Sequence, residues 1–67
     1  MRWQQLDKTL RMGAVLVMDG TFGAWVEDGD KLININAKTA RAILARDLVV
    51  INEKRSRNCY AFRHKYI

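Results

Sequence analysis

Apolar residues recur first at helical and then at strand spacing along the chain. In "RWQQLDKTLRMG", Trp3, Leu6 and Leu10 fall at steps of three and four, which places them on one face of a helix. Gly13 follows at the position where a helix commonly ends with a glycine in the left-handed conformation. We therefore predict a helix over about Trp3–Met12.

Three short β-prone runs follow: "AVLVM" (14–18), "AWVE" (24–27) and "KLINI" (31–35). An Asp-Gly pair follows each of the first two runs, and Asp-Gly favours tight turns because glycine tolerates positive φ. Leu32 and Asn34 alternate with Ile33 and Ile35, as in a half-buried strand. This segment predicts an antiparallel meander.

A second helix and a hairpin complete the pattern. Asn36 is a suitable N-cap for the Ala-rich segment "AKTARAILARDLV", which has an apolar stripe and good helix propensity. The strand "LVVIN", the loop "EKRSRN" and the return strand "CYAFRH" follow, with Tyr60, Phe62 and His64 on one face of the last strand. We predict one α+β domain over residues 1–67, in the order helix, three-stranded meander, helix, C-terminal β-hairpin.

Composition narrows the class of protein. A chain of 67 residues with 49% hydrophobic content makes one small folded domain with a thin core. No run of 18 apolar residues predicts a membrane span, and the N-terminus lacks a signal-peptide pattern. Cys59 is the only cysteine, so no internal disulfide forms and a reducing cytoplasm is the expected location.

The net charge of +5 is distributed unevenly along the chain. Residues 1–30 carry three Lys/Arg against five Asp/Glu, whereas residues 31–67 carry nine against two. A positive field at one end of so small a domain favours an anionic partner.

From Ile35 onward the chain resembles the C-terminal half of a winged-helix DNA-binding domain. In that family a recognition helix ends in a short apolar phrase, as "ILARDLVV" does here, and leads into a hairpin called the wing. The wing has a basic tip and an aromatic on its return strand, as in "INEKRSRNCYAF". The resemblance covers about half of the chain and implies a winged-helix-like fold with DNA as partner.

The sequence departs from the family before Ile35. A full winged helix has two helices ahead of the recognition helix, but residues 14–35 read as strands here. A generic small α+β domain is therefore the alternative fold.

Basic residues of the second half are the candidate nucleic-acid contacts. In a winged-helix geometry the helix enters a groove while the loop lies on the neighbouring phosphates. Arg41 has the fork that can read a guanine edge, and the remaining bases act mainly through charge. For any single residue, ordinary solvation of the surface is the alternative. The candidate residues are Lys38, Arg41, Lys54, Arg55, Arg57, Arg63 and Lys65.

Aromatic residues offer two other kinds of site. Tyr60, Phe62 and Tyr66 are candidates for a stacking platform for unpaired bases, although core packing is the simpler role for Phe62. Phe22, in a turn between two glycines, and Trp25 are candidates for protein contact, with packing as the simpler role for Trp25.

The chain shows no pattern that indicates an enzyme, a cofactor or a metal site. Cys59 and His64 alone do not form a metal site, and "EDGD" lacks the ligand spacing of a calcium loop. Ser56 is the only serine, and no base is placed beside it by sequence.

Three functions stay open from the sequence. The first is a small DNA-binding transcription regulator, plausibly a homodimer through the acidic N-terminal half or the first helix. The second is a phage-type or plasmid-type inhibitor that docks on a host protein, with Phe22 and Trp25 in contact. RNA binding through Tyr60 and Phe62 is the third.

Overall fold

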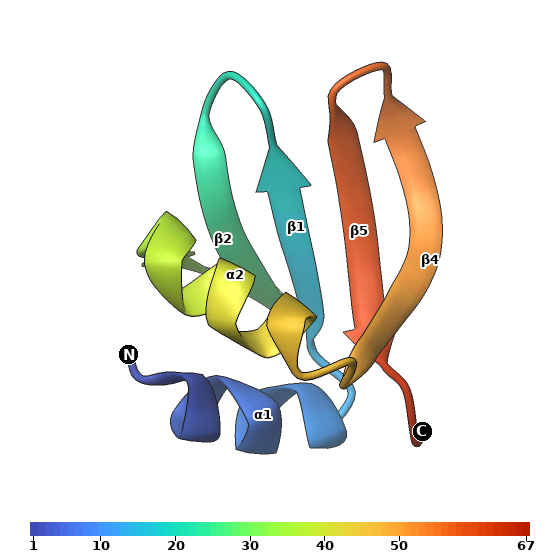
Figure 1. Cartoon of the computed structure of the whole chain (residues 1–67). Coiled ribbons are helices and arrows are strands. Elements are labelled where there is room, and N and C mark those ends of the chain that lie inside the picture. Colours follow the sequence, from blue (N-terminus) through green and yellow to red (C-terminus); the bar gives the residue numbers. More distant parts are fainter.

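Five strands form one antiparallel sheet, in the order β3-β2-β1-β5-β4, with two helices packed on it (Figure 1). The computed structural model describes all residues from 1 to 67. The elements are α1 (Trp3–Arg11), β1 (Val15–Asp19), β2 (Gly23–Asp28), β3 (Lys31–Ile35), α2 (Ala37–Ala45), β4 (Val49–Ser56) and β5 (Cys59–His64). The α+β class that the sequence predicts is confirmed.

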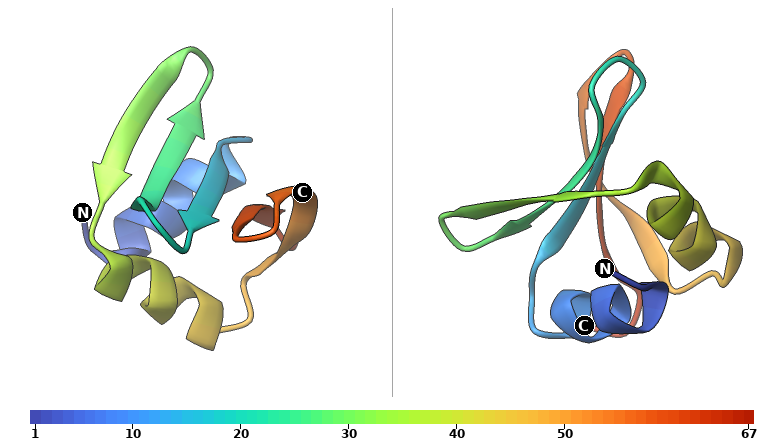
Figure 2. Two further views of the ribbon diagram at one scale, coloured as in Figure 1. Left: turned by 90° about the horizontal axis from the view of Figure 1, so that it is seen from above. Right: turned by 90° about the vertical axis from the view of Figure 1, so that its left-hand side faces the viewer.

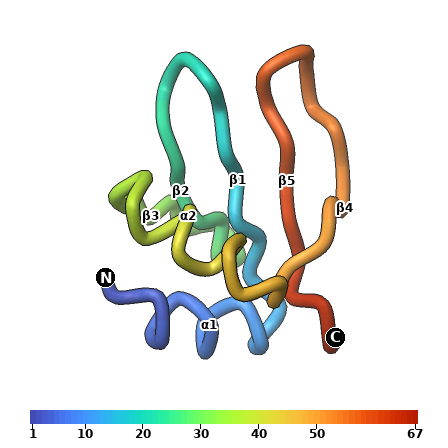
Figure 3. Tube along the Cα trace, in the orientation of Figure 1, coloured from blue at the N-terminus to red at the C-terminus, as the bar shows by residue number.

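The pairing of β1 with β5 joins the meander to the final hairpin. Leu16 lies opposite Phe62, and Val17 lies opposite Ala61. At the far end, the amide of Gly20 donates to the carbonyl of Asn58 at 2.8 Å, so the tips of the two hairpins are tied together. The chain trace shows these hairpins running side by side above the helices (Figure 3). The β4–β5 hairpin is therefore part of the sheet.

One face of the sheet is covered by both helices. Leu6 and Leu10 of α1 and Ile43 of α2 are fully buried in the main core. They pack with buried residues from three strands, from α2 and from the residue before β1, namely Leu16, Ala24, Val26, Val49, Ala40 and Ala14. Truncating one of the buried leucines to alanine costs about 2–5 kcal/mol, because the cavity that it leaves only partly collapses.

The other face has no helix and carries a small second cluster. Val17, Cys59 and Ala61 are buried there, with Val15 and Trp25 partly buried beside them. The sheet is strongly twisted, so that its two hairpins cross in the side view (Figure 2). This twist curls the strands around the second cluster and buries it without a covering helix.

The β4–β5 turn is much shorter than the sequence predicts. Residues 53–56, expected in a loop, belong to β4, and only Arg57 and Asn58 form the turn. Register shifts fall between Ile51 and Glu53 and between Lys54 and Ser56, so β4 contains irregularities that a strictly alternating pattern does not reveal.

A buried polar pair fastens α1 to the end of β5. His64 has no exposed surface, and its Nε2 lies 2.7 Å from Oδ1 of Asp7. Its Nδ1 accepts from the amide of Tyr66 at 3.1 Å, so the ring proton resides on Nε2, which donates to Asp7. Both ring nitrogens are therefore occupied within the fold.

The pKa of Asp7 reflects this pair. Burial raises the pKa of the carboxyl, but hydrogen bonds from His64 and Arg11 outweigh burial and leave the pKa below its ordinary value. A carboxyl whose folded pKa is lowered stabilises the fold above its unfolded pKa, and this contribution is lost as pH falls through the folded pKa.

We expect Asp7→Ala to cost about 1–3 kcal/mol of unfolding free energy, because it leaves the buried Nε2–H of His64 without an acceptor. Asp7→Asn keeps an acceptor and should cost less. Urea unfolding at neutral pH compares the two variants. Below about pH 4 the parent should lose stability more steeply than Asp7→Asn, which has no carboxyl to protonate. If Asp7→Ala and Asp7→Asn lost the same unfolding free energy at neutral pH, this role of Asp7 would be contradicted.

Candidate nucleic-acid interface

The seven basic residues predicted as contacts fall at three separate places. Lys38 and Arg41 lie on α2, whereas Lys54 and Arg57 lie near the tip of the β4–β5 hairpin, beyond the helices. Arg63 and Lys65 lie at the opposite end of β5. The fold thus does not bring the seven together on one face.

Arg55 is held by two carboxylates on the face without helices. Its Nη1 and Nη2 lie 2.5 and 2.6 Å from the two carboxylate oxygens of Glu27, and its Nε donates to Glu53 at 2.7 Å. This bidentate pair joins β4 to β2 across the two strands between them. The Arg55 charge is therefore neutralised within the chain.

The same contacts shift the pKa values of the groups involved. The hydrogen bonds that Arg55 donates to Glu27 and Glu53 raise the pKa of Arg55 further above its usual value. The hydrogen bond from Arg55 lowers the pKa of Glu27, against the opposing effect of burial. Both groups stay ionised at neutral pH.

Two other predicted contacts have partners at the end of β5. Lys65 donates to Asp47 at 2.8 Å, and this hydrogen bond raises the pKa of Lys65. Arg63 donates to the carbonyl of Ile67 at 2.9 Å and more weakly to that of His64. Both side chains therefore have polar partners within the chain.

The excess positive charge lies entirely on the helices and their flanks. Residues 1–13 and 36–46 carry six Lys/Arg and a single acid, Asp7. All remaining residues carry six Lys/Arg and six Asp/Glu, so they are neutral as a set. The net +5 of the protein is therefore the net charge of its helical layer.

Two adjoining grooves bring several of these bases together. One groove, on α1, is lined by Arg2, Gln4, Gln5 and Lys8. The second lies between the helices and is lined by Met1, Arg2, Trp3, Gln4, Lys38, Thr39 and Ala42. Arg2 and Gln4 line both, so the grooves adjoin. We call Arg2, Lys8, Lys38 and Arg46 the helix surface.

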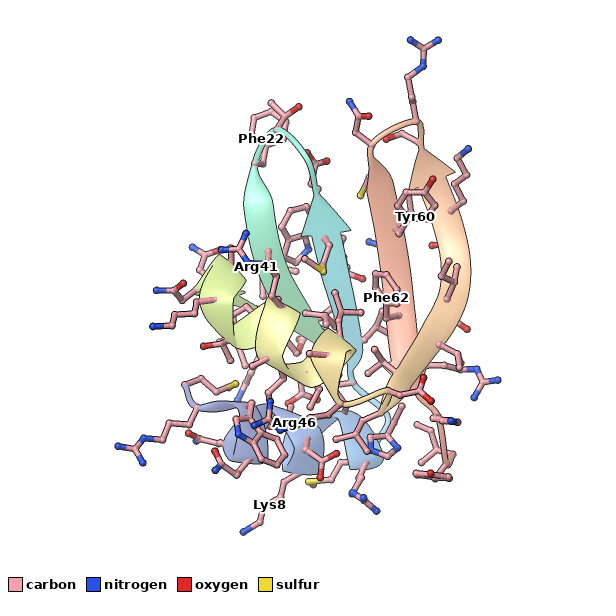
Figure 4. The ribbon with its side chains drawn as sticks, viewed as in Figure 1. Lys8, Phe22, Arg41, Arg46, Tyr60 and Phe62 are labelled. Carbon is pink, nitrogen blue, oxygen red and sulfur yellow. The ribbon has the colours of Figure 1, made fainter.

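Arg46 joins the helix surface through Trp3. Its guanidinium lies 4.0 Å from the centre of the indole ring, and its Nη1 donates to the carbonyl of Ala42. No carboxylate pairs with it, so its charge remains available. Arg41, in contrast, lies on the upper side of α2, whereas Lys8 extends below α1 (Figure 4).

Sequence reasoning missed Arg2, Lys8 and Arg46. The charge count over residues 1–30 concealed the first two, because four acids of the meander outweigh the bases of α1. Their exposed positions on a helix with only one acid are the signal that could have identified them.

Phe22 is held outward by an ordered turn. Oδ1 of Asp19 accepts from the amides of Thr21 and Phe22 at 2.7 and 3.0 Å, and these bonds lower the pKa of Asp19. The Phe22 side chain is 82% exposed at the tip of the β1–β2 hairpin. Trp25 is instead half-buried and donates its indole N–H to Glu27.

The aromatic residues of the last strand do not form one platform. Tyr60 and Phe62 lie on the helix-covered face of the sheet, and Phe62 packs against the main core. Tyr66 lies beyond the strand beside His64, with ring centres 5.6 Å apart. Only Tyr60 and Phe62 are therefore neighbours on one strand.

The structure also places the candidate thiol and the potential metal ligands. Cys59 is buried in the second cluster, and burial together with Asp19 raises the pKa of its thiol. No three His, Cys, Asp or Glu side chains gather as a potential metal site. Neither helix is long and apolar enough to cross a membrane.

Comparison with protein-family models, curated proteins and solved structures finds no match to this chain.

The Arg55 pair gives a stability prediction. Arg55→Ala leaves Glu27 and Glu53 without their shared cation, and we expect a loss of about 1 kcal/mol of unfolding free energy, since the pair is partly exposed. The neighbouring Lys54→Ala removes an exposed base with no carboxylate partner and should stay within about 0.5 kcal/mol of the parent. Chemical denaturation at neutral pH measures both.

The stabilisation by the Arg55 pair should decrease as pH falls. Because the folded pKa of Glu27 is lowered, the pair contributes above the unfolded pKa and is lost as pH falls. The difference in unfolding free energy between Arg55→Ala and the parent should therefore become smaller below about pH 4. A difference that widens in acid would contradict this assignment.

Proposed function

We propose that this protein is a small regulatory protein that binds duplex DNA through the helix surface. The observation that supports this best is the location of the whole net charge of +5 on the helical layer. A concentrated positive surface attracts a polyanion and speeds its encounter with the protein.

Phosphate groups fit the chemistry of this surface. Arg2, Lys8 and Lys38 are exposed and have no carboxylate partner, so each can neutralise a phosphate without first breaking an ion pair. Gln4 and Gln5 lie among them and carry amide donors that also bind phosphate oxygens. Such contacts position a protein on the duplex and are largely independent of base sequence.

In a winged-helix mode, α2 lies in a groove while the β4–β5 hairpin contacts the flanking backbone. Arg41 on α2 then reads a base edge, and Lys54 and Arg57 at the hairpin tip bind phosphates. This mode uses a different part of the surface from Arg2 and Lys8. We favour the helix surface because residues 1–13 and 36–46 hold a net charge of +5. The β4–β5 hairpin, residues 49–64, holds four Lys/Arg against Glu53, and one of the four, Arg55, is paired with carboxylates.

Protein docking is the second candidate, and it rests on Phe22. An 82% exposed phenylalanine in a turn fixed by Asp19 is already oriented for contact. Anchors of this kind can contribute about 2 kcal/mol or more to a protein interface. Under this function the paired hairpin tips dock on a host protein, as an inhibitor does.

Two double variants with equal net charge separate the two basic surfaces. Arg2→Ala/Lys8→Ala should weaken binding to duplex DNA and reduce the slope of log K against log salt by about 1.8, since two phosphate contacts are lost. Lys54→Ala/Arg57→Ala removes the same charge from the hairpin and should leave the slope nearly unchanged. Fluorescence anisotropy with a labelled duplex, measured between about 50 and 200 mM salt, gives both slopes.

Three outcomes would contradict the proposal. Equal loss of duplex affinity in the two double variants would show that binding responds to net charge alone. Loss of affinity only in Lys54→Ala/Arg57→Ala would favour the winged-helix mode. Failure of the parent to bind duplex DNA at low salt would remove the proposed function. Loss of biological activity in Phe22→Ala, with duplex binding absent, would favour docking on a protein.

A further inference from the structure

The two edges of the sheet differ in how they are protected. The β4 edge has two register shifts and a run of charged residues, Glu53, Lys54 and Arg55, which are devices that discourage pairing with another strand. The β3 edge pairs with β2 in unbroken register and carries one charged residue, Lys31, at its end. Leu32 on this edge is 71% exposed. The β3 edge is thus open for a further strand.

The hydrogen-bonding pattern of β3 shows which groups are free. Gly29 has φ of 62° and begins a two-residue turn that closes on the pair Asp28 and Lys31. Because hydrogen-bonded and non-bonded pairs alternate in antiparallel strands, Lys31, Ile33 and Ile35 point their backbone groups to β2. The N–H and C=O groups of Leu32 and Asn34 therefore face outward.

The two ends of this strand differ in charge: Asp28, Asp30 and Lys31 give its start a net charge of −1, whereas Lys38 follows its end. Asp28 and Asp30 flank Gly29 in the turn before β3, and neither carboxylate has a cationic partner in the chain. Lys38, in the first turn of α2 just after β3, has no carboxylate partner. An antiparallel second copy of β3 would place the acidic end of each strand beside the basic end of the other.

We propose that the protein forms a symmetric homodimer by antiparallel pairing of β3 with β3 of a second copy, centred on Ile33. In this register Leu32 of each copy exchanges both backbone hydrogen bonds with Asn34 of the other. Asp30, in the turn before β3, then lies opposite Asn36 of the other copy, two residues from Lys38, and this contact occurs twice. A two-fold contact of this kind is closed, so it ends at two copies.

The dimer is a different one from that expected from the sequence, which placed the contact on the acidic half or on the first helix. Pairing at β3 makes one continuous sheet. Both helical layers lie on the same side of it, because the two-fold axis that relates antiparallel strands is perpendicular to the sheet. The contact is a short strand, so the dimer should be weaker than one with an extensive interface. The pairing does not require DNA, and it brings an acid of the second copy towards Lys38, which the proposed function assigns to phosphate, while Arg2 and Lys8 are unaffected.

Oligomeric state and amide exchange test the pairing directly. We expect the mass measured by sedimentation to rise from monomer to dimer between about 10 and 500 µM protein, as for a contact of small area. Over the same range the amides of Leu32 and Asn34 should gain protection from hydrogen exchange, whereas that of Ile33, already directed to β2, should change little. A monomer throughout this range would overturn the proposal.

Matched lysine substitutions at the two edges locate the contact. Leu32→Lys adds a charge to the β3 edge and should abolish the dimer. Ile51→Lys makes the same change at a 60% exposed site on the β4 edge and should leave it intact. Circular dichroism checks folding, and both variants should fold because both side chains are exposed. A dimer retained in Leu32→Lys, or lost only in Ile51→Lys, would overturn the assignment.

A charge exchange tests the register. Asp30→Lys places a lysine near Lys38 of the other copy and should weaken the dimer several-fold, and adding Lys38→Glu should restore it. A merely structural role of Asp30 would give no such rescue. Weakening without rescue would exclude the register centred on Ile33.

Discussion

The pairing of β1 with β5 is the contact on which the rest of the structure depends. It joins residues separated by more than half of the chain, Leu16 with Phe62 and Val17 with Ala61. Without it the meander and the final hairpin would be two small sheets, each with too little apolar surface to fold alone. With it, one face is wide enough to receive both helices, and the His64–Asp7 pair fastens α1 to the end of β5.

This sheet also determines where charge is left free. The curled face without helices brings β4 near β2, and there Arg55 is paired with Glu27 and Glu53. At the other end of β5, Lys65 is paired with Asp47. Acids and bases thus cancel over the sheet, while the outer sides of α1 and α2 hold bases and almost no acids. The charge that can attract a partner is a consequence of this packing.

Local pattern predicted much of the fold. The spacing of Trp3, Leu6 and Leu10 identified α1, and the cap at Asn36 marks the start of α2, where its side chain accepts from the amide of Lys38. The β4 bulges and the pairing of Arg55 with Glu27 could not be predicted, because they depend on long-range pairing of strands. For the same reason the sequence did not single out Arg2 and Lys8 as unpaired bases: it gives charge along the chain, whereas the partner of each charge depends on the fold.

Mapping a bound duplex onto the chain tests the central claim most directly, namely that the free charge of the helical layer is the contact surface. Isotope-labelled protein would be titrated with a short DNA duplex while amide chemical shifts are recorded. We predict that the largest changes occur at Arg2, Gln4, Gln5 and Lys8 and at the start of α2. Changes concentrated in residues 54–58, at the tip of the β4–β5 hairpin, would contradict the account.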